Sequence, residues 1–108
     1  MGEKHFIIWL SETEWLVVYI KTIKNKVDSF LVKLVTLIED TEYEIARFDS
    51  GHEFVHVDIL LPDGSKERTV KFPNIGSMEV VDFAIENFKL NFDLYKERFL
   101  KWLDEKNR

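Results

Sequence analysis

The sequence contains 108 residues, of which 45% are hydrophobic and 14% are aromatic. This length fits a single domain, residues 1–108, because a domain usually contains roughly 100–200 residues. The apolar content is high enough to build a core, which excludes disordered, collagen-like and low-complexity proteins. Cysteine is absent, so disulfides, thiolate metal sites and a cysteine nucleophile are excluded as well.

The formal net charge is −5 at pH 7, and lysine and glutamate are frequent whereas glutamine is absent. This bias is typical of hyperthermophiles, so we expect a thermophilic source. No run reaches the roughly 18–20 apolar residues that a membrane helix needs. The five consecutive apolar residues at Phe6–Leu10 are too few for the core of a signal peptide. The sequence therefore predicts a cytoplasmic protein.

The first two thirds of the chain have the composition of β-strands. Trp15–Lys24 and Phe30–Ile38 are dense in β-branched and aromatic residues, and Asn25–Asp28 is a polar turn between them. Both runs are largely apolar on both faces, which predicts central strands that are covered on two sides. The remaining strands are expected at Tyr43–Phe48, Phe54–Leu61 and Lys66–Phe72, with an edge strand at Phe6–Leu10.

Polar segments separate these strands. Pro62–Ser65 is the clearest turn, because its proline presets φ and Gly64 accepts a positive φ. Ser11–Glu14 and the charged Glu39–Glu42 are further turns, and Asp49–Glu53 is expected to be a loop.

A long helix is predicted from about Met78 to Asp104, with Ser77 as its N-cap. An apolar stripe at alternating spacings of three and four residues supports this helix. The helix would span roughly 40 Å, whereas an eight-residue strand spans only about 27 Å. We therefore expect the helix to overhang the sheet or to break near Asn91–Asp93.

Several large apolar residues lie off the main stripe of this helix, namely Phe83, Leu90, Leu94, Leu100 and Leu103. One face of a sheet cannot cover both sets of residues. We therefore expect a second copy of the chain to cover the rest, in a C2 homodimer through the helix. The alternative is a bent helix that wraps around its own sheet.

Together the elements predict an α+β fold: an antiparallel meander of five to six strands with one long C-terminal helix packed on one face. The alternation of strands and helices that a Rossmann-like or P-loop fold needs is missing. The sequence also contains no GxGxxG, GxxxxGK[ST], GxSxG or HExxH motif. No cofactor is expected.

One polar cluster stands out, in the stretch from Arg47 to Asp58. Its candidate catalytic residues are Arg47, Asp49, His52, His56 and Asp58. His56 and Asp58 are two positions apart, so on a strand both project from one face, opposite to Val55 and Val57. The third histidine, His5, stands alone near the N-terminus and is given no role.

Three interpretations of this cluster remain open. It could be a general acid–base site, in which histidine moves protons, a carboxylate fixes its tautomer and arginine stabilises a phosphate-like transition state. That set of groups suits metal-independent cleavage of RNA through the 2′-hydroxyl. The two histidines and two aspartates could instead hold Zn²⁺ or Mn²⁺. Finally, they could be ordinary polar residues on the wetter face of a sheet.

A second candidate is a basic hairpin tip that contains Lys21, Lys24, Lys26 and Lys33. Tyr19 and Phe30 lie nearby in the sequence, and grooves for single-stranded nucleic acids combine such residues. The chain is acidic, however, and nucleic-acid-binding proteins usually carry a basic field. A solvated turn that resists aggregation is therefore the favoured interpretation.

The order of these segments also carries a resemblance. It is formed by Tyr43–Asp49, Gly51–His52, His56–Leu60, Asp63–Gly64 and Tyr95–Phe99. This order resembles a small uncharacterised family of archaea and bacteria with an ARFD…H…H.D.L…G core. It also looks like the TumE-type toxins of toxin–antitoxin pairs, which carry an RYDN…H…H segment after paired strands.

The resemblance implies a toxin that acts on RNA and is neutralised by an antitoxin protein. Arg47, Asp49, His52 and His56 occupy the matching positions, whereas Phe48 replaces the usual Tyr and Ser50 the usual Asn. The leading hypothesis is thus a toxin-like ribonuclease. In it Arg47 binds phosphate, His52 and His56 act as acid and base, and Asp49 or Asp58 orients a histidine. The alternative is a non-enzymatic homodimeric interaction module with no catalytic site.

Overall fold

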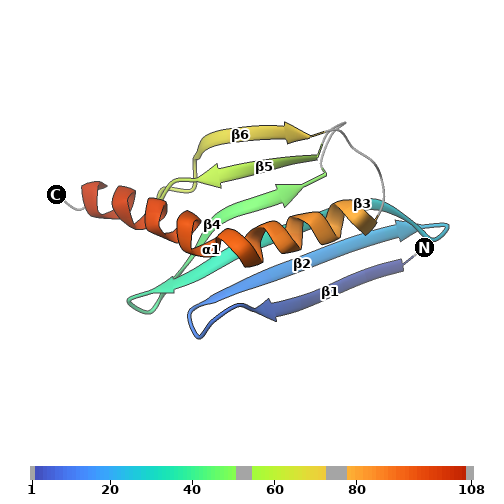
Figure 1. The fold of residues 1–108 in the computed structure, drawn as a ribbon, viewed down its shortest axis with the longest axis horizontal. Coiled ribbons are helices and arrows are strands. Elements are labelled where there is room, and N and C mark those ends of the chain that lie inside the picture. Colours follow the sequence, from blue (N-terminus) through green and yellow to red (C-terminus); the bar gives the residue numbers. More distant parts are fainter. Residues whose placement is uncertain (1, 51–54, 73–77, 107–108) are drawn as a thin grey trace.

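The computed structural model describes residues 2–50, 55–72 and 78–106. It contains six strands followed by one helix (Figure 1). The elements are β1 (Gly2–Trp9), β2 (Glu14–Ile23), β3 (Lys26–Ile38), β4 (Thr41–Asp49), β5 (Val55–Leu60), β6 (Lys66–Phe72) and α1 (Met78–Lys106).

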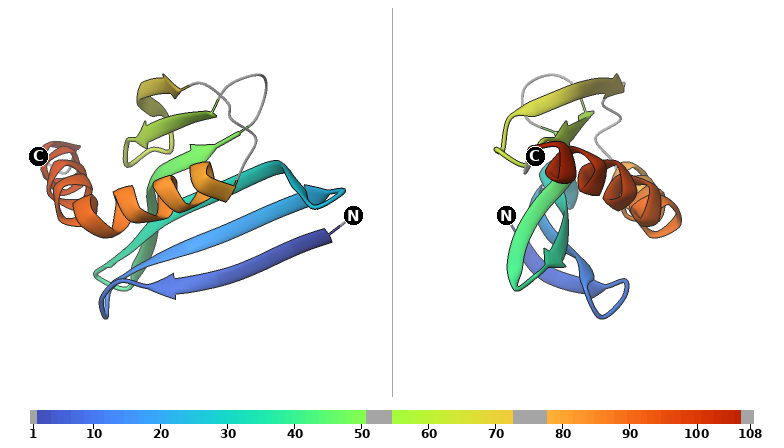
Figure 2. Two further views of the ribbon diagram at one scale, coloured as in Figure 1. Left: turned by 45° about the vertical axis from the view of Figure 1, so that its right-hand side comes forward. Right: turned by 90° about the vertical axis from the view of Figure 1, so that its left-hand side faces the viewer.

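The strands form one sheet in the order β1-β2-β3-β4-β5-β6, and each pairs antiparallel with the next. β1 and β6 are therefore the two edges of the sheet. α1 lies across one face, against β3 and β4 (Figures 1 and 2). The predicted α+β meander with a single C-terminal helix is confirmed, and the sheet has six strands.

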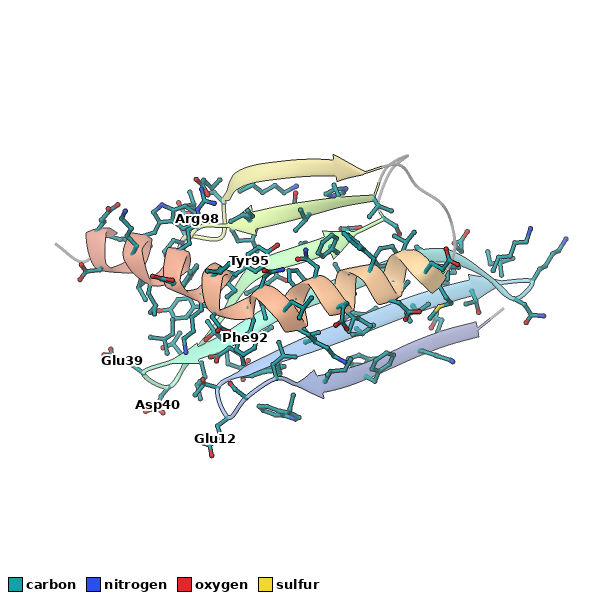
Figure 3. All side chains as sticks on the ribbon, in the orientation of Figure 1. Glu12, Glu39, Asp40, Phe92, Tyr95 and Arg98 are labelled. Carbon is teal, nitrogen blue, oxygen red and sulfur yellow. The ribbon has the colours of Figure 1, made fainter. Side chains whose placement is uncertain are left out.

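Two of the hairpin turns are shorter than the sequence predicted. Lys24 and Asn25 have φ of 52° and 64°, and Glu39 and Asp40 have φ of 49° and 64°. Two successive residues with positive φ reverse a chain within a two-residue turn. β3 and β4 therefore begin earlier than expected, at Lys26 and Thr41, and Glu39 and Asp40 form the tip of their hairpin (Figure 3).

The turn between β5 and β6 lies where the sequence predicted it. Gly64 has φ of 88° and donates its N–H to the Leu61 carbonyl at 2.8 Å. Asp63 Oδ1 accepts hydrogen bonds from the N–H and the hydroxyl of Ser65, at 2.9 and 2.6 Å. These bonds stabilise the turn through residues close together in the chain.

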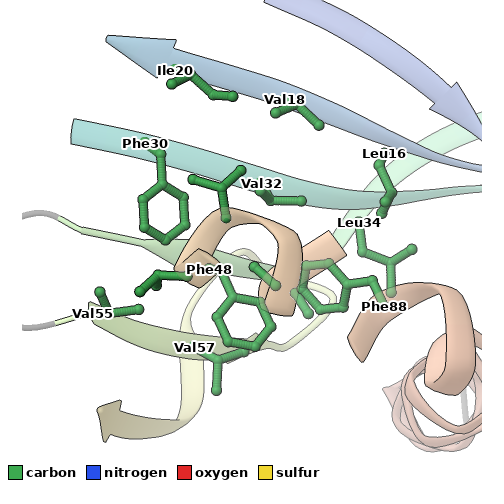
Figure 4. Close-up of a cluster of buried hydrophobic side chains, with 14 of the residues drawn as sticks. Leu16, Val18, Ile20, Phe30, Val32, Leu34, Phe48, Val55, Val57 and Phe88 are labelled. Carbon is green, nitrogen blue, oxygen red and sulfur yellow. The ribbon is translucent and has the colours of Figure 1, made fainter. Parts of the chain in front are cut away.

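The hydrophobic core lies between the sheet and α1 (Figure 4). Alternate residues of the strands point into it, as strand geometry requires. Phe48 of β4 and Phe88 of α1 lie near its centre with 1% and 0% exposure, and their ring centroids are 5.0 Å apart. The strand residues of this core are Leu16, Val18, Ile20, Phe30, Val32, Leu34, Ile45, Ala46, Phe48, Val55 and Val57.

α1 is continuous from Met78 to Lys106, without a break near Asn91–Asp93. Its last turns extend past the ends of β5 and β6 (Figure 1), so the predicted overhang is confirmed. The predicted N-cap, Ser77, lies outside the described residues. No helix in the described part of the chain has the length and apolar run that crossing a bilayer requires.

The apolar residues that the sequence placed off the main helix stripe are exposed, with one exception. Phe83, Leu90 and Leu94 are 51%, 73% and 63% exposed, and Leu100 is 39% exposed. Leu103 instead packs against the core. The helix therefore presents apolar surface that its own sheet does not cover.

Candidate functional site

The candidate residues Arg47, Asp49, His56 and Asp58 lie together on the face of the sheet that α1 does not cover, which we call the open face. Their strands, β4 and β5, are neighbours, and Arg47 faces Asp58 while Asp49 faces His56 in the pairing register. The side chains alternate with core residues of the same strands, which places them on the open face. The structure thus brings these four residues together, and Asp49, which the sequence placed in a loop, is the last residue of β4.

His56 and Asp58 make a close contact within β5. His56 Nε2 lies 3.5 Å from Asp58 Oδ2, and the Lys66 ammonium of β6 lies 3.3 Å from the same oxygen. Asp58 is only 1% exposed, so it is not the solvent-exposed surface residue that one of the three interpretations expected. A carboxylate this buried requires ionic or hydrogen-bonding partners, and Lys66 and His56 provide them.

Arg47 is held by a carboxylate of its own strand. Its guanidinium donates to both oxygens of Glu44, with distances of 2.7 to 3.1 Å. The Lys33 ammonium lies 3.7 Å from Glu44 as well. A bidentate pair of this kind is among the stronger charged contacts in proteins. A phosphate would therefore have to compete with Glu44 for Arg47.

Glu44 was not among the residues predicted for the site, and a β-bulge explains why. In a regular strand, residues three positions apart point to opposite faces. Here Leu34 faces Ala46 but Val35 faces Glu44, so Ile45 is an extra residue in β4. The extra residue turns Glu44 onto the same face as Arg47. The sequence contains no local signal for this bulge.

The open face continues across the strands on the N-terminal side of the site. The Lys33 ammonium lies over the Tyr19 ring, 5.9 Å from its centroid. His5 stacks on Tyr19 with a centroid separation of 4.3 Å and an interplanar angle of 8°. His5 therefore has a contact that sequence reasoning missed. The only sequence signal was that β1 and β2 would form a hairpin.

A shallow cavity of about 670 Å³ lies over this part of the sheet. Its lining includes His5 and Tyr19 and reaches Asp49 at the end of β4. Asp49 and His56 face one another across β4 and β5, so the cavity ends beside the candidate site. The open face thus combines a mixed polar and aromatic hollow with a cluster of ionic contacts.

Two predicted groupings are incomplete among the described residues. Phe30 is buried in the core, on the face opposite to Tyr19, although both residues line the cavity described above. Lys24 and Lys26 are exposed at the hairpin tip, and Lys33 is engaged by Glu44. Within the described residues no group of three or more His, Asp or Glu side chains could hold a metal ion. His52, which the metal and acid–base hypotheses both used, lies outside those residues.

Comparisons with known proteins place the chain in a family. No curated protein and no solved structure matches it. The sequence model of a domain of unknown function, DUF7718, matches residues 1–105. The chain therefore belongs to the DUF7718 family.

Proposed function

We propose that this domain is a non-enzymatic interaction module that assembles as a homodimer. The observation that carries the proposal is the number of large apolar side chains left exposed outside the core. They lie on the outer side of α1 and on the edge strand β1, and they include Phe83, Leu90, Leu94, Phe6, Ile7 and Trp9. Large exposed apolar surfaces are typical of protein–protein contacts.

The contacts of the candidate catalytic groups support a structural role for them. Arg47 is bound by Glu44, and Asp58 lies between Lys66 and His56. A general acid or base has to reach a proton on its substrate. Groups already engaged in ionic contacts within the sheet are better suited to stabilising the open face.

The oligomeric state tests this proposal directly. Sedimentation equilibrium of the full chain over a wide concentration range should give a mass approaching twice the 12.9 kDa of one chain. A purified sample should also leave labelled RNA intact. A monomer at every concentration would contradict the proposal, and so would RNA cleavage that depends on His56.

A second candidate function is a toxin-like ribonuclease with an antitoxin partner. The contact of His56 with Asp58 favours it, because a carboxylate beside an imidazole can fix the tautomer that moves a proton. In this candidate Arg47 binds the phosphate of RNA, His52 and His56 exchange the proton, and Asp49 or Asp58 orients a histidine. The resemblance to TumE-type toxins supplies the expected substrate and partner.

Controlled expression distinguishes the two candidates. The wild type, His56→Ala and, as a control at the exposed tip of the β3–β4 hairpin, Glu39→Ala would be expressed from a tightly regulated promoter. A ribonuclease predicts growth arrest and degraded RNA in the wild type and in Glu39→Ala, with recovery in His56→Ala. Equal growth and intact RNA in all three would rule the ribonuclease out. For either function we propose a cytoplasmic location in a thermophilic prokaryote, which is supported by composition alone.

A further inference from the structure

Among the described residues, the edge strand β1 is paired on one side only. It is the first strand in the sheet order, and within the described residues β2 is its only paired strand. In an antiparallel strand, every second residue points its N–H and C=O groups away from the existing neighbour. Such an edge is a template for another strand.

The side chains of β1 do not protect this edge. Phe6, Ile7 and Trp9 are 37%, 52% and 63% exposed, and the only charged residues of the strand are Glu3 and Lys4. The opposite edge differs, because four of the seven residues in β6 (KERTVKF) are charged. Charged residues are a common way to prevent edge pairing. β6 therefore has the composition of a protected edge, and β1 does not.

We propose that β1 pairs antiparallel with β1 of a second copy about a twofold axis at Ile7, which joins the two sheets into one. This inference rests on the proposed homodimer and names its surface. In this register Ile7 faces itself, Phe6 faces Ile8, and His5 faces Trp9. All five positions from His5 to Trp9 then meet an apolar or aromatic partner, as favourable cross-strand pairs do.

A register shifted by one position towards the N-terminus is less favourable. An axis at Phe6 would place Lys4 opposite Ile8 and Glu3 opposite Trp9, with both charges against apolar groups. The axis at Ile7 instead places Lys4 opposite Leu10 and Glu3 opposite Ser11, both beyond the end of β1 at Trp9. The distribution of charge along β1 therefore disfavours the register with its axis at Phe6.

The charges on α1 disfavour a parallel pairing of two helices through its exposed row. Its exposed apolar row Phe83, Leu90 and Leu94 is followed, three positions later in each case, by an exposed acidic residue: Glu86, Asp93 and Glu97. Residues three apart are neighbours on a helix surface. Two copies packed in parallel through this row would bring these acidic residues together, and like charges across an interface oppose binding. β1 carries no such excess of one sign.

Two single cysteine variants test this pairing, because the chain has no cysteine of its own. In the proposed register, residue 7 of one copy lies directly opposite residue 7 of the other. The two Cα atoms would be about 4.5–5.5 Å apart, within the range that a disulfide can bridge. Ile7→Cys should therefore form a covalent dimer under mild oxidation, which a reducing agent reverses. Leu90→Cys, the control on α1, should stay uncrosslinked.

Charge substitutions give an independent readout by sedimentation equilibrium. Ile7→Lys places two ammonium groups at the twofold axis and should leave a monomer, whereas Leu90→Lys, with the same change in charge, should remain dimeric. A dimer that survives Ile7→Lys, together with efficient crosslinking of Leu90→Cys alone, would overturn the inference and assign the interface to α1. A wild type that is monomeric at every concentration would instead refute the proposed homodimer itself. Circular dichroism would confirm that each variant is folded.

Discussion

Lys96 of α1 donates a hydrogen bond of 2.8 Å to Glu14, the first residue of β2. The same carboxylate accepts hydrogen bonds of 2.8 Å from the hydroxyls of Thr36 and Ser11. Glu14 is only 4% exposed. Burial alone would raise its pKa, but the hydrogen bonds from Lys96, Thr13, Thr36 and Ser11 outweigh burial and lower the pKa from 4.5 to about 2. This contact therefore ties the helix to the sheet through a buried charge.

The first prediction concerns the pH dependence of this contact. The folded-state pKa of Glu14 lies below its ordinary value, so the charge stabilises the fold above about pH 5 and the stabilisation is lost as the pH falls towards 2. The shift corresponds to about 3 kcal/mol. Glu14→Gln should therefore lower the free energy of unfolding by roughly this amount at pH 7, and by about half as much at pH 3. Urea unfolding at several pH values measures the difference.

Glu12→Gln is the matched control, because Glu12 is exposed in the same turn (Figure 3). It removes the same charge without removing the contact to Lys96. If Glu14→Gln and Glu12→Gln had equal stability at pH 7, the buried ion pair would not stabilise the fold.

A buried hydrogen bond at the end of β4 provides the second prediction. The Ser50 hydroxyl accepts a hydrogen bond from the Phe30 N–H at 2.8 Å, and Ser50 is 8% exposed. Ser50→Ala leaves that N–H without its partner, and an unsatisfied buried donor costs about 1–3 kcal/mol. Thermal unfolding should show the loss of stability. Ser65→Ala, at an exposed turn, should have a smaller effect, and equal effects would argue against this bond.

The third prediction tests the centre of the core. Phe88 is fully buried, and its ring lies 5.0 Å from that of Phe48 and 5.3 Å from that of Tyr95. Phe88→Ala should destabilise the fold by about 3–5 kcal/mol, because it opens a cavity. Leu90→Ala, two residues later and 73% exposed, should change the free energy of unfolding far less. Comparable losses in the two variants would mean that α1 packs on the sheet through a different side.

Much of the fold follows from local patterns in the sequence. The apolar runs gave the strands, and the Asp63–Gly64 turn and the helix stripe were confirmed because each depends on residues close together in the chain. The Glu14–Lys96 contact joins residues 82 positions apart, so no local pattern reveals it. The sequence suggested only a polar turn around Glu14.

The arrangement of the candidate site could also be predicted only where it depends on local sequence patterns. Alternation along β5 placed His56 and Asp58 on one face, and the hairpin placed Arg47 beside Asp58. The partner of Arg47 was missed because the bulge at Ile45 moves Glu44 onto the open face. Burial of Asp58 was missed as well, since it depends on packing between strands rather than on the pattern along one strand.

The last prediction concerns RNA binding by the open face after the replacement of Glu44, whose carboxylate neutralises two cations there. Glu44 contacts both Lys33 and Arg47. Glu44→Gln releases these two cations and changes the net charge from −5 to −4. If the open face has no RNA-binding role in the wild type, the wild type should not bind labelled poly(U). Glu44→Gln should gain weak binding that disappears with added salt, because contacts to phosphate are electrostatic.

Glu42→Gln is the control for the change in net charge, because Glu42 is exposed on the same strand. Fluorescence anisotropy at low salt compares the three proteins. Tight binding by the wild type, abolished by Arg47→Ala, would favour the ribonuclease candidate over the interaction module. Equal binding by Glu42→Gln and Glu44→Gln would show that net charge, rather than the release of Arg47 and Lys33, controls the interaction.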